Sequence, residues 1–587
     1  MPVPVSYPGV YIEEIPSGVH TITGVATSIT AFVGAAQRGP VDNPVSVFSY
    51  GDFQRVFGGM TADVLPETTI PLYSMAFAVN DFFLNGGSQA VIVRVVSGAA
   101  AATSSSPALV AAAAAQIALS PATAASSSAT SGSSAPSGSS TPASSAGSSG
   151  GSSASGSLTL AASSTGSWGN NLSAVVNSQT QDPSKNYLFN LTVTETDPVT
   201  NAVVNTEKFY NLSMSPTDPT YVASYLQQNS QLVVVSGSVP PTPAGGSPPV
   251  APPANPVDSK GNPIPNKATG GVDGSSITKS AIFDSSLQAT KRGIYALDNI
   301  QIFNILIIPP YQTMQSADVG ALIAECAPYC YGRRAFLLVD PPDDWDQSPP
   351  PLAFNTIAKD VTALRTAAGA YGSYAAVFYP RVLKPNPLMN NQIQTFSASG
   401  TLAGIFANTD AQRGVWKAPA GIYAVLGGAS GLTVTMNDGE NGQLNEIGVN
   451  CLRTFPIIGS VVWGSRTLNG ADVLADDYKY IPIRRFVLFL EQSLYQGTHW
   501  VVFEPNDEPL WAKIRLNVGA FMQTLFRQGA FQGNPASQAY FVKCDNETTT
   551  QNDINNGVVN IIVGFAPLKP AEFVVLQIQQ IAGSIQT

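Results

Sequence analysis

From Val95 to Gln181 the chain carries no Asp, Glu, Lys or Arg. The centre of this stretch, residues 103–156, consists almost entirely of Ser, Ala, Gly, Thr and Pro. Such residues bury too little apolar surface to offset the entropy lost when a chain becomes ordered, so we expect a flexible insertion here. A glycosylated Ser/Thr/Pro stalk is the alternative, but the N-terminal sequence has neither the basic nor the apolar region of a secretion signal.

A second linker, residues 240–266, is rich in proline and is expected to be extended. Between the two linkers, residues 172–176, 188–195 and 207–212 alternate between apolar and polar side chains, as strands do. We therefore predict that residues 99–280 form a β-rich insertion in a loop of a larger domain.

The segments on either side of the insertion, residues 23–98 and 281–392, together predict one α/β domain. Apolar strand-like runs alternate with helical patterns in these segments, which favours a parallel or mixed sheet covered by helices. The expected strands are residues 29–34, 90–96, 303–308, 335–339 and 374–379, and the expected helices are residues 71–84, 314–330 and 355–368.

The C-terminal block carries the clearest helix signals. Pro482 suits the first turn of a helix that ends at Gly497, and residues 498–504 (THWVVFE) are predicted to be a strand. A second helix is expected to be capped by Asn506 and to end before Gly529. Its apolar positions share one side (Trp511, Ile514, Val518, Phe521, Met522, Leu525 and Phe526), and Lys513, Thr524 and Arg527 lie opposite.

Two positions in the second helix depart from this pattern. Arg515 projects into the apolar side, where a buried guanidinium needs a carboxylate such as Glu504 or Glu508. Leu516 lies among polar positions, as a residue covered by another subunit would. The alternative is an exposed Leu beside an Arg whose charged end reaches the solvent.

Both ends of the chain are predicted to be extended arms, residues 1–22 and 568–587. Three prolines before Gly9 exclude an early helix, and residues 10–15 alternate as a strand does. After the strand-like residues 539–545 and 558–566, the last run, residues 570–580, stands at the end of the chain. A terminal strand can join the sheet edge of a neighbouring copy through main-chain hydrogen bonds, and pairing within one copy is the alternative.

Several motifs of the C-terminal block resemble one family, the contractile tail sheath proteins of phages, tailocins and related injection systems. The motifs are VWGSRT (462–467), Arg484-Arg485, WVVFEPNDEPLW (500–511), FVKCD (541–545) and APLKPAEF (566–573). Near the N-terminus, YPGVYIEE (7–14) is similar to the opening of such proteins. The resemblance implies a C-terminal inner domain, residues 393–567, after the α/β domain, and an outward-pointing insertion.

The resemblance further implies a structural subunit that polymerises as six-fold rings around an inner tube and contracts to drive the tube through a target envelope. Its expected partners are other copies of itself, the tube protein, and baseplate and cap proteins. The arms would exchange strands between subunits through Val10, Tyr11, Ile12, Phe573, Val574, Val575, Leu576 and Ile578. Lys513 and Arg527 are the predicted contacts to the tube. Phage, tailocin and other injection systems stay open as the parent particle.

Composition agrees with a structural role. Charged residues make up 11% of the chain and the net charge is −10, so the chain lacks the basic footprint of a nucleic-acid-binding protein and any polybasic membrane signal. The chain has no run of eighteen apolar residues, so no membrane span is predicted. Four cysteines in 587 residues predict no disulfide framework, which favours assembly in the bacterial cytoplasm.

The candidate catalytic and metal-binding groups are weak, and we expect no enzyme activity, metal or cofactor. The Asp-rich sequence 339–346 (VDPPDDWD) follows a predicted strand and contains Asp340, Asp343, Asp344 and Asp346, but its two prolines and Trp345 favour a surface turn over a magnesium site. Cys326 and Cys330 are expected to pack in the core, because a zinc site needs more ligands than they provide.

Catalytic histidines and nucleotide loops are equally weak candidates. His20 and His499, the only histidines, lie in the arm and among aromatic residues, where neither is placed as a base. Residues 34–40 (GAAQRGP) lack the Gly-Lys-Ser/Thr ending of a nucleotide-binding loop. The alternatives to a sheath subunit are another self-assembling protein, such as a shell or surface-layer component, and an α/β enzyme.

Overall fold

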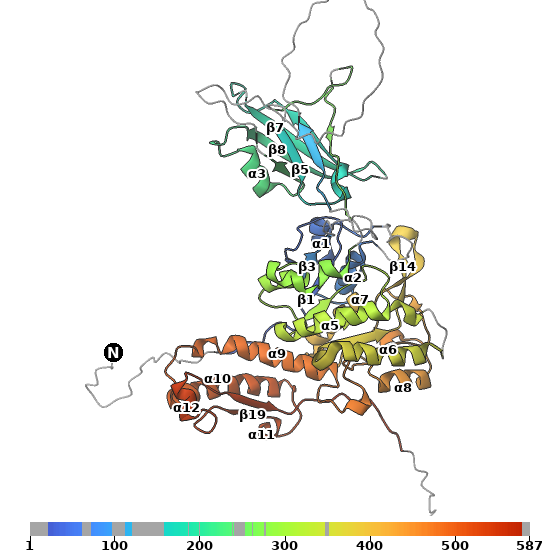
Figure 1. Ribbon diagram of the computed structural model, residues 1–587, viewed down its shortest axis with the longest axis vertical. Helices are drawn as coiled ribbons and strands as arrows, with labels where there is room; N and C mark the ends of the chain where they lie inside the picture. Colours follow the sequence, from blue (N-terminus) through green and yellow to red (C-terminus); the bar gives the residue numbers. More distant parts are fainter. Residues whose placement is uncertain are drawn as a thin grey trace, which may run out of the picture.

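A computed structural model describes residues 21–61, 72–96, 112–119 and 158–577, apart from residues 186, 199, 238, 240–252, 261, 275–276 and 347–351. The chain forms three parts (Figure 1): a β-rich unit at the top, an α/β domain at the centre and a smaller unit of two long helices at its lower left. Residues 1–20 of the N-terminal arm and residues 578–587 of the C-terminal arm lie outside the described residues.

The central domain is built on an eight-stranded sheet of order β18-β17-β13-β12-β11-β1-β3-β2. Neighbouring strands from β3 to β17 run parallel, and the two edge strands β2 and β18 run antiparallel to their neighbours. Its strands are β1 (Thr30–Gly34), β2 (Val45–Val47), β3 (Ala90–Arg94), β11 (Ile305–Ile307), β12 (Phe336–Val339), β13 (Ala375–Tyr379), β17 (Asn450–Phe455) and β18 (Gly459–Val462). The mixed α/β sheet predicted from the apolar runs is therefore confirmed.

Helices cover both faces of this sheet, because the chain moves outward from β1 in opposite directions and right-handed crossovers then place helices on opposite sides. The helices are α1 (Tyr50–Phe57), α2 (Ser74–Leu84), α5 (Ser316–Arg333), α6 (Leu352–Ala368), α7 (Ser399–Arg413) and α8 (Asp438–Glu446). Helices α5 and α6 pack together, and so do α2 and α7. Gly400 permits the second contact, since a Cβ there would lie 2.2 Å from the carbonyl oxygen of Ala78.

The expected boundary between residues 392 and 393 does not coincide with a structural division. A hairpin of β14 (Val382–Asn386) and β15 (Gln392–Phe396) spans it, and β16 (Gly431–Leu432) pairs with β14. Strands β17 and β18, which follow the expected boundary, belong to the central sheet. A sheet extended by distant chain segments leaves no boundary signal in local composition.

The β-rich unit has two sheets, β10-β6-β7-β8 and β4-β5-β9, and its own apolar core around Trp168 and Leu191. Its elements are β4 (Gln116–Leu119), β5 (Leu158–Ala162), β6 (Leu172–Asn177), β7 (Leu188–Thr196), β8 (Val203–Ser213), α3 (Val222–Asn229), β9 (Val233–Ser236) and β10 (Asn266–Lys267).

Two arginines of the central domain hold this unit. The buried Arg94 guanidinium donates to the carbonyl oxygens of Ala36 and Gly39 at 2.9 and 2.8 Å and to that of Thr165 at 2.8 Å. Arg38 pairs with Glu195 at 2.9 Å. The loop at residues 34–40 therefore turns carbonyl oxygens toward a cation, whereas a phosphate-binding loop turns its N–H groups toward an anion.

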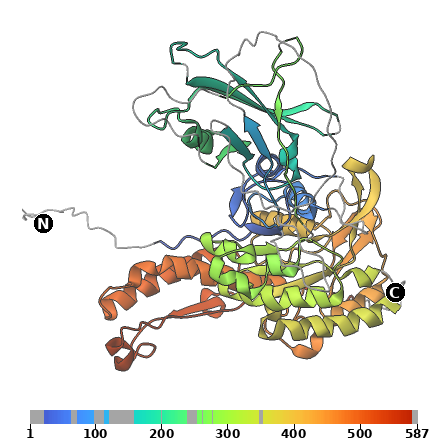
Figure 2. The same cartoon turned by 45° about the horizontal axis from the view of Figure 1, so that its top comes forward.

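The two-helix unit consists of α9 (Ile481–Gly497), α10 (Glu508–Arg527) and the hairpin of β19 (Tyr540–Lys543) and β20 (Ile562–Phe565). Figure 2 shows these elements projecting from the α/β domain. The predicted apolar side of α10 forms the core of the unit: Trp511, Ile514, Val518, Phe521, Met522 and Leu525 are all buried, and Phe526 packs against them.

Four local predictions were wrong. Residues 116–119 lie in the stretch expected to be flexible, but they form β4, in which Ile117 and Leu119 are fully buried. Residues 498–504 form a short 3-10 turn, η8 (His499–Val501), and not a strand; Val502 and Phe503 are exposed there, so no sheet covers them. Asp507 caps α10, because its carboxylate accepts from the N–H of Leu510, while Asn506 accepts from the Trp511 indole. Trp345 is fully buried rather than in a surface turn, and its indole donates to Asp360 at 3.0 Å.

A buried ion pair joins the two-helix unit to the α/β domain. Arg485 in α9 donates to both carboxylate oxygens of Asp410 in α7, at 3.0 and 2.6 Å, and to the carbonyl oxygen of Thr27 at 2.9 Å. Both charged side chains are 3% exposed. Removing one partner of such a pair leaves the other charge buried and uncompensated.

We predict that Asp410→Asn lowers the free energy of unfolding by about 3–5 kcal/mol, because Arg485 loses its carboxylate. Urea unfolding followed by tryptophan fluorescence measures the change. The matched control is Asp438→Asn, which removes the same charge from a pair with Arg453 in which Asp438 is 94% exposed, so little change is expected. Equal effects of the two substitutions would contradict the prediction.

Candidate functional site: the base of the C-terminal arm

The hairpin of β19 and β20 is a sheet of only two strands. Its register pairs Tyr540 with Phe565 and Lys543 with Ile562, and within the described residues neither strand has a partner on its outer side. An isolated hairpin is marginally stable and offers main-chain N–H and C=O groups at both edges. This sheet can therefore accept one further strand on each side.

The chain leaves this hairpin through a fixed segment. The Ala566 N–H donates to the carbonyl oxygen of Ala539 at 2.8 Å, and the Gln532 N–H donates to that of Ala566 at 3.0 Å. Pro567 forms a bridge with Phe531. The arm thus begins with a defined direction, set by main-chain contacts to residues before β19.

An ion cluster then holds the arm at Glu572. Arg466, whose side chain is fully buried, donates from Nε and Nη2 to the two carboxylate oxygens of Glu572, both at 2.7 Å. The Tyr480 hydroxyl donates to the same carboxylate at 3.0 Å and the Asn445 amide at 2.8 Å. The remaining donors of Arg466 reach the carbonyl oxygens of Asn445 and Gly470 and the carboxylate of Asp472. We call Arg466, Glu572, Tyr480 and Asn445 the arm clamp.

The charges of the arm clamp stabilise one another. Burial alone would raise the pKa of Glu572, but the hydrogen bonds from Arg466 and Asn445 and the Arg466 charge outweigh it, so the pKa of the carboxyl lies below its ordinary value. Burial, the Glu572 charge and the hydrogen bond to Glu572 raise the pKa of the Tyr480 hydroxyl to about 12. Glu572 is therefore ionised and Tyr480 neutral at physiological pH.

Immediately after the clamp, the predicted strand residues are exposed. Phe573, Val574, Val575 and Leu576 are 73%, 79%, 81% and 83% exposed, and residues 571–577 form no strand. Ile578 and the N-terminal Val10, Tyr11 and Ile12 lie outside the described residues. Four consecutive apolar side chains in solvent are the kind of surface that a partner covers. Strand pairing of either arm remains a prediction.

The predicted tube contacts lie on the outer face of α10. Lys513 and Arg527 are exposed, and no ion pair to either occurs within the described residues. They are about four turns apart on nearly the same side of the helix, with the exposed Leu516 between them. Arg515 lies beside this face and pairs with Glu508 at 2.5 Å, so one of the two expected carboxylates is its partner.

The residues considered for chemistry have structural partners. Asp343 and Asp346 form ion pairs with Arg381, and Asp340 accepts from Ser399. Cys326 and Cys330 are buried in the apolar core of the α/β domain, as predicted. Within the described part of the chain, no cluster of His, Cys, Asp or Glu is placed to hold a metal ion, and none of the described helices has the length and hydropathy to span a bilayer.

Sequence reasoning missed the arm clamp. Arg466 and Glu572 both stand in the motifs that carry the family resemblance, VWGSRT and APLKPAEF, but they are separated by 106 positions. A single sequence contains no signal for a pairing across that distance. The motifs marked the right residues without revealing that they meet.

We predict that Glu572→Gln destabilises the base of the arm by about 1–3 kcal/mol, because a buried guanidinium loses a charge-assisted bidentate partner. Amide hydrogen exchange at Gln532 and Ala566, whose N–H groups are hydrogen-bonded at the base of the arm, should become faster. Because the folded pKa of Glu572 is depressed below its ordinary 4.5, the clamp acts above that pH and is lost as the pH falls through the folded pKa. Wild type and variant should therefore converge only once the pH falls below the depressed pKa of Glu572.

The control is Glu547→Gln, whose partner Lys543 lies at 3.6 Å in an exposed pair. Its exchange rates should match those of the wild type. A Glu572→Gln variant with unchanged protection at neutral pH would show that the clamp does not hold the arm.

Residues 475–581 match the family described as phage tail sheath C-terminal domain, which confirms the resemblance seen in the C-terminal block. Among curated protein sequences, none matches the chain.

Solved structures extend the likeness to nearly the whole chain. The helical sheath of the anti-feeding prophage in its contracted state aligns with a TM-score of 0.51 and 21% identity, covering 98% of this chain and 100% of that one. The contracted sheath complex of PVC, an extracellular contractile injection system, aligns at 0.52 and 18%, covering 99% of each chain. A sheath tail protein from Listeria innocua aligns at 0.52 and 11%, covering 93% and 96%. The chain therefore has the fold of contractile sheath proteins.

Proposed function

We propose that this chain is the sheath subunit of a contractile injection apparatus, which polymerises around an inner tube and contracts to drive the tube through a target envelope. The observation that carries the proposal is the two-stranded sheet with two unpaired edges, next to an anchored arm whose apolar residues are exposed. The fold shared with contracted sheaths supports the same function.

The arms supply what the hairpin lacks. A strand from the C-terminal arm of one neighbour and a strand from the N-terminal arm of another would complete a four-stranded sheet on β19 and β20 through main-chain hydrogen bonds. The interface is heterologous, so each copy gives and receives strands and the assembly grows as a filament of stacked six-fold rings. Contraction then rearranges the contacts between subunit bodies while the exchanged strands keep neighbours connected.

The other assignments follow from this arrangement. The α10 face with Lys513 and Arg527 faces the tube, and the β-rich unit, at the opposite end of the molecule in Figure 1, decorates the outside. Baseplate and cap proteins bind the two ends of the sheath, and assembly takes place in the bacterial cytoplasm. The role is mechanical and uses no cofactor, metal or nucleic acid.

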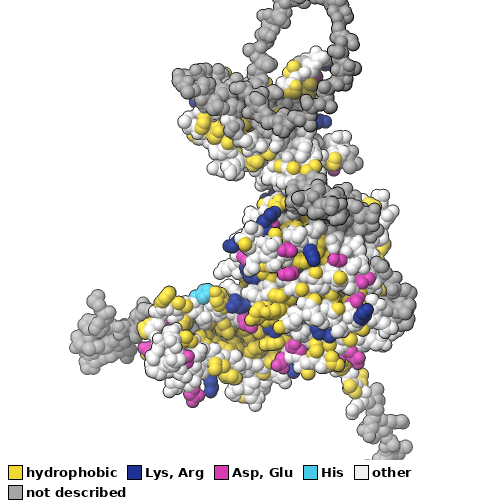
Figure 3. All heavy atoms as spheres, viewed as in Figure 1, with side chains coloured by type: hydrophobic (Ala, Val, Ile, Leu, Met, Phe, Trp, Pro, Cys, Tyr) yellow, Lys and Arg dark blue, Asp and Glu magenta, His cyan; other side chains and the backbone are white. Residues whose placement is uncertain are grey.

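The exposed surface suits extensive contacts between subunits. Figure 3 shows hydrophobic side chains gathered over the two-helix unit and the adjoining α/β domain. Six large hydrophobic residues of these two parts of the chain are between 48% and 61% exposed: Tyr331, Tyr495, Val502, Leu516, Phe541 and Ile562. Such a surface is costly in a monomer and is removed from water in a packed assembly.

We predict that the purified chain forms striated hollow cylinders in negative-stain micrographs, and that a variant ending at Glu572 stays monomeric. The truncation removes only residues beyond the clamp, so the thermal unfolding midpoint of the monomer should be unchanged. Size-exclusion chromatography and sedimentation measure assembly. Cylinders formed by the truncated chain would contradict strand exchange by the C-terminal arm, and a flat lattice from the wild type would favour a surface-layer protein instead.

We predict that Lys513→Glu with Arg527→Glu weakens binding of the sheath to its inner tube by about tenfold, because repulsion replaces attraction at each subunit. Co-sedimentation with purified tube, repeated at low and high salt, measures the effect. Lys208→Glu with Lys359→Glu makes the same charge change at exposed positions outside α10 and should leave tube binding unchanged. Equal tube binding by both variants would rule out this face as the contact.

A further inference from the structure

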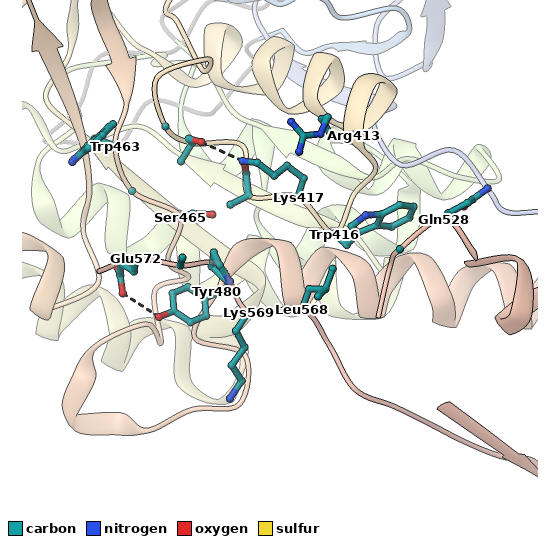
Figure 4. A pocket seen from close by; sticks show the side chains of 17 residues that line it. Arg413, Trp416, Lys417, Trp463, Ser465, Tyr480, Gln528, Leu568, Lys569 and Glu572 are labelled. Atoms are coloured by element: carbon teal, nitrogen blue, oxygen red, sulfur yellow. Dashed lines mark hydrogen bonds between the residues drawn. The ribbon is translucent and has the colours of Figure 1, made fainter. Parts of the chain in front are cut away.

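A cleft of about 720 Å³ opens beside the base of the C-terminal arm. Its walls come from the end of α7 and the loop after it, from the segment before α9, and from residues 568–572 of the arm. Figure 4 shows Arg413, Lys417 and Trp416 on one side of the cleft, Trp463 at its far end and Lys569 on the arm side. Aromatic and basic side chains thus surround the same space.

The cleft has more positive than negative charge. Within the described residues, Arg413, Lys417 and Lys569 form no ion pair with a carboxylate, and the one carboxylate in the lining, Glu572, is held by the arm clamp. Among the described residues, the Lys417 ammonium donates only to main-chain carbonyl oxygens, at 2.6 Å to Ala418 and 3.4 Å to Ala420. Burial and the neighbouring Arg413 charge lower the pKa of Lys417, so a bound anion would relieve a real repulsion.

A second, independent feature is an unused hydrogen-bonding group. Ser465 lines the cleft and is 8% exposed, and its hydroxyl has no hydrogen-bond partner within the described residues. Buried hydroxyls are normally paired, so one that faces a basic cleft is suited to a ligand oxygen. Cations, an unpartnered hydroxyl and flanking indoles together make a site for a carboxylate carried on an apolar peptide.

We propose that this cleft binds Glu13 and Glu14 in the N-terminal arm of a second copy of the chain. These two glutamates are the only Asp, Glu, Lys or Arg residues in positions 1–20, and they follow the apolar Val10, Tyr11 and Ile12. The inference rests on the proposed function. It adds a charge-specific binding site for the N-terminal arm of a neighbour, next to the residues where the C-terminal arm of this copy begins.

The path of the chain favours a second copy over the same copy. Residues 22–27 run along α9 from its C-terminal end toward its N-terminal end: Ile22 lies against Gly497, the Val25 N–H donates to Ser493, and Arg485 donates to Thr27. The chain before Ile22 therefore leaves α9 at the end remote from the cleft, which Trp416 marks by its contact with Phe486.

The length of the arm also favours a second copy. Helix α9 has 17 residues and is about 25 Å long. The seven Cα–Cα steps from Glu14 to Thr21 span at most about 25 Å when the chain is fully extended. The arm of the same copy would have to reverse direction at Thr21 and run back along about 16 Å of α9 to reach the level of Phe486, whereas a neighbour's arm needs no such reversal.

Direct binding tests the site without assembly. A fluorescent peptide of residues 1–20 is titrated into the full chain carrying the truncation at Glu572, and anisotropy measures its affinity. We expect binding to be about tenfold weaker for Arg413→Glu with Lys417→Glu, and about tenfold weaker for a peptide with Glu13→Lys and Glu14→Lys. The swapped peptide should regain affinity for the swapped protein. Lys208→Glu with Lys359→Glu is the control and should bind the native peptide as the wild type does.

Equal affinity of native and swapped peptides for the wild type, or no recovery in the swapped combination, would overturn the proposal. Failure of the wild type to form cylinders would instead count against the sheath function. The peptide titration does not depend on cylinder assembly, so its result is independent of that outcome. In the full-length chain, each charge reversal alone should reduce the mass of sedimented cylinders and the combination should restore it. Thermal unfolding of Arg413→Gln with Lys417→Gln verifies that the cleft charges are not needed for folding.

Discussion

The buried guanidinium of Arg466 determines where the C-terminal arm leaves the molecule. Moving a cation out of water costs several kcal/mol unless hydrogen bonds and an opposite charge replace its hydration. Arg466 obtains both, and its bidentate carboxylate partner belongs to the arm itself. Glu572 is therefore tied to the folded body, whereas the next residue, Phe573, is 73% exposed. The boundary between anchored and projecting chain falls between two adjacent residues.

Helix α9 connects this boundary to the rest of the protein. The N-terminal segment lies along it, and the arm clamp includes Tyr480 just before its first residue. The helix is fixed to the α/β domain by Arg485 through Asp410 and by Arg484, which stacks 4.3 Å from the Tyr374 ring centroid and donates to Ser373. A force applied to either arm would therefore be transmitted to the α/β domain through the short, buried contacts of Arg484 and Arg485.

The sequence predicts the parts of this arrangement that depend on local patterns. The apolar side of α10 and the strand–helix alternation of the central domain follow from side-chain periodicity, and both are present in the structure. Residues 498–504 have the composition of a strand, but they form the turn η8 between two packed helices, and within the described residues no strand pairs with them. Asn506 and Asp507, the two possible caps of α10, are adjacent, and side-chain periodicity does not distinguish neighbouring positions. The contacts that build the arm base join residues far apart in the chain, so they depend on the complete fold.

In the proposed sheath, the buried ion pairs and the exposed apolar surfaces would have separate roles. The ion pairs of Arg466 and Arg485 lie within one subunit and lose much of their stabilisation if one partner is withdrawn, so a rearrangement that preserves them is favoured. The exposed apolar side chains of the two-helix unit make contacts that depend on area and not on direction, so they can be exchanged between successive packings at small cost. Contraction would then proceed by sliding apolar surfaces past one another around rigid bodies. The exchanged strands must bend only beyond Glu572, where the chain is no longer held.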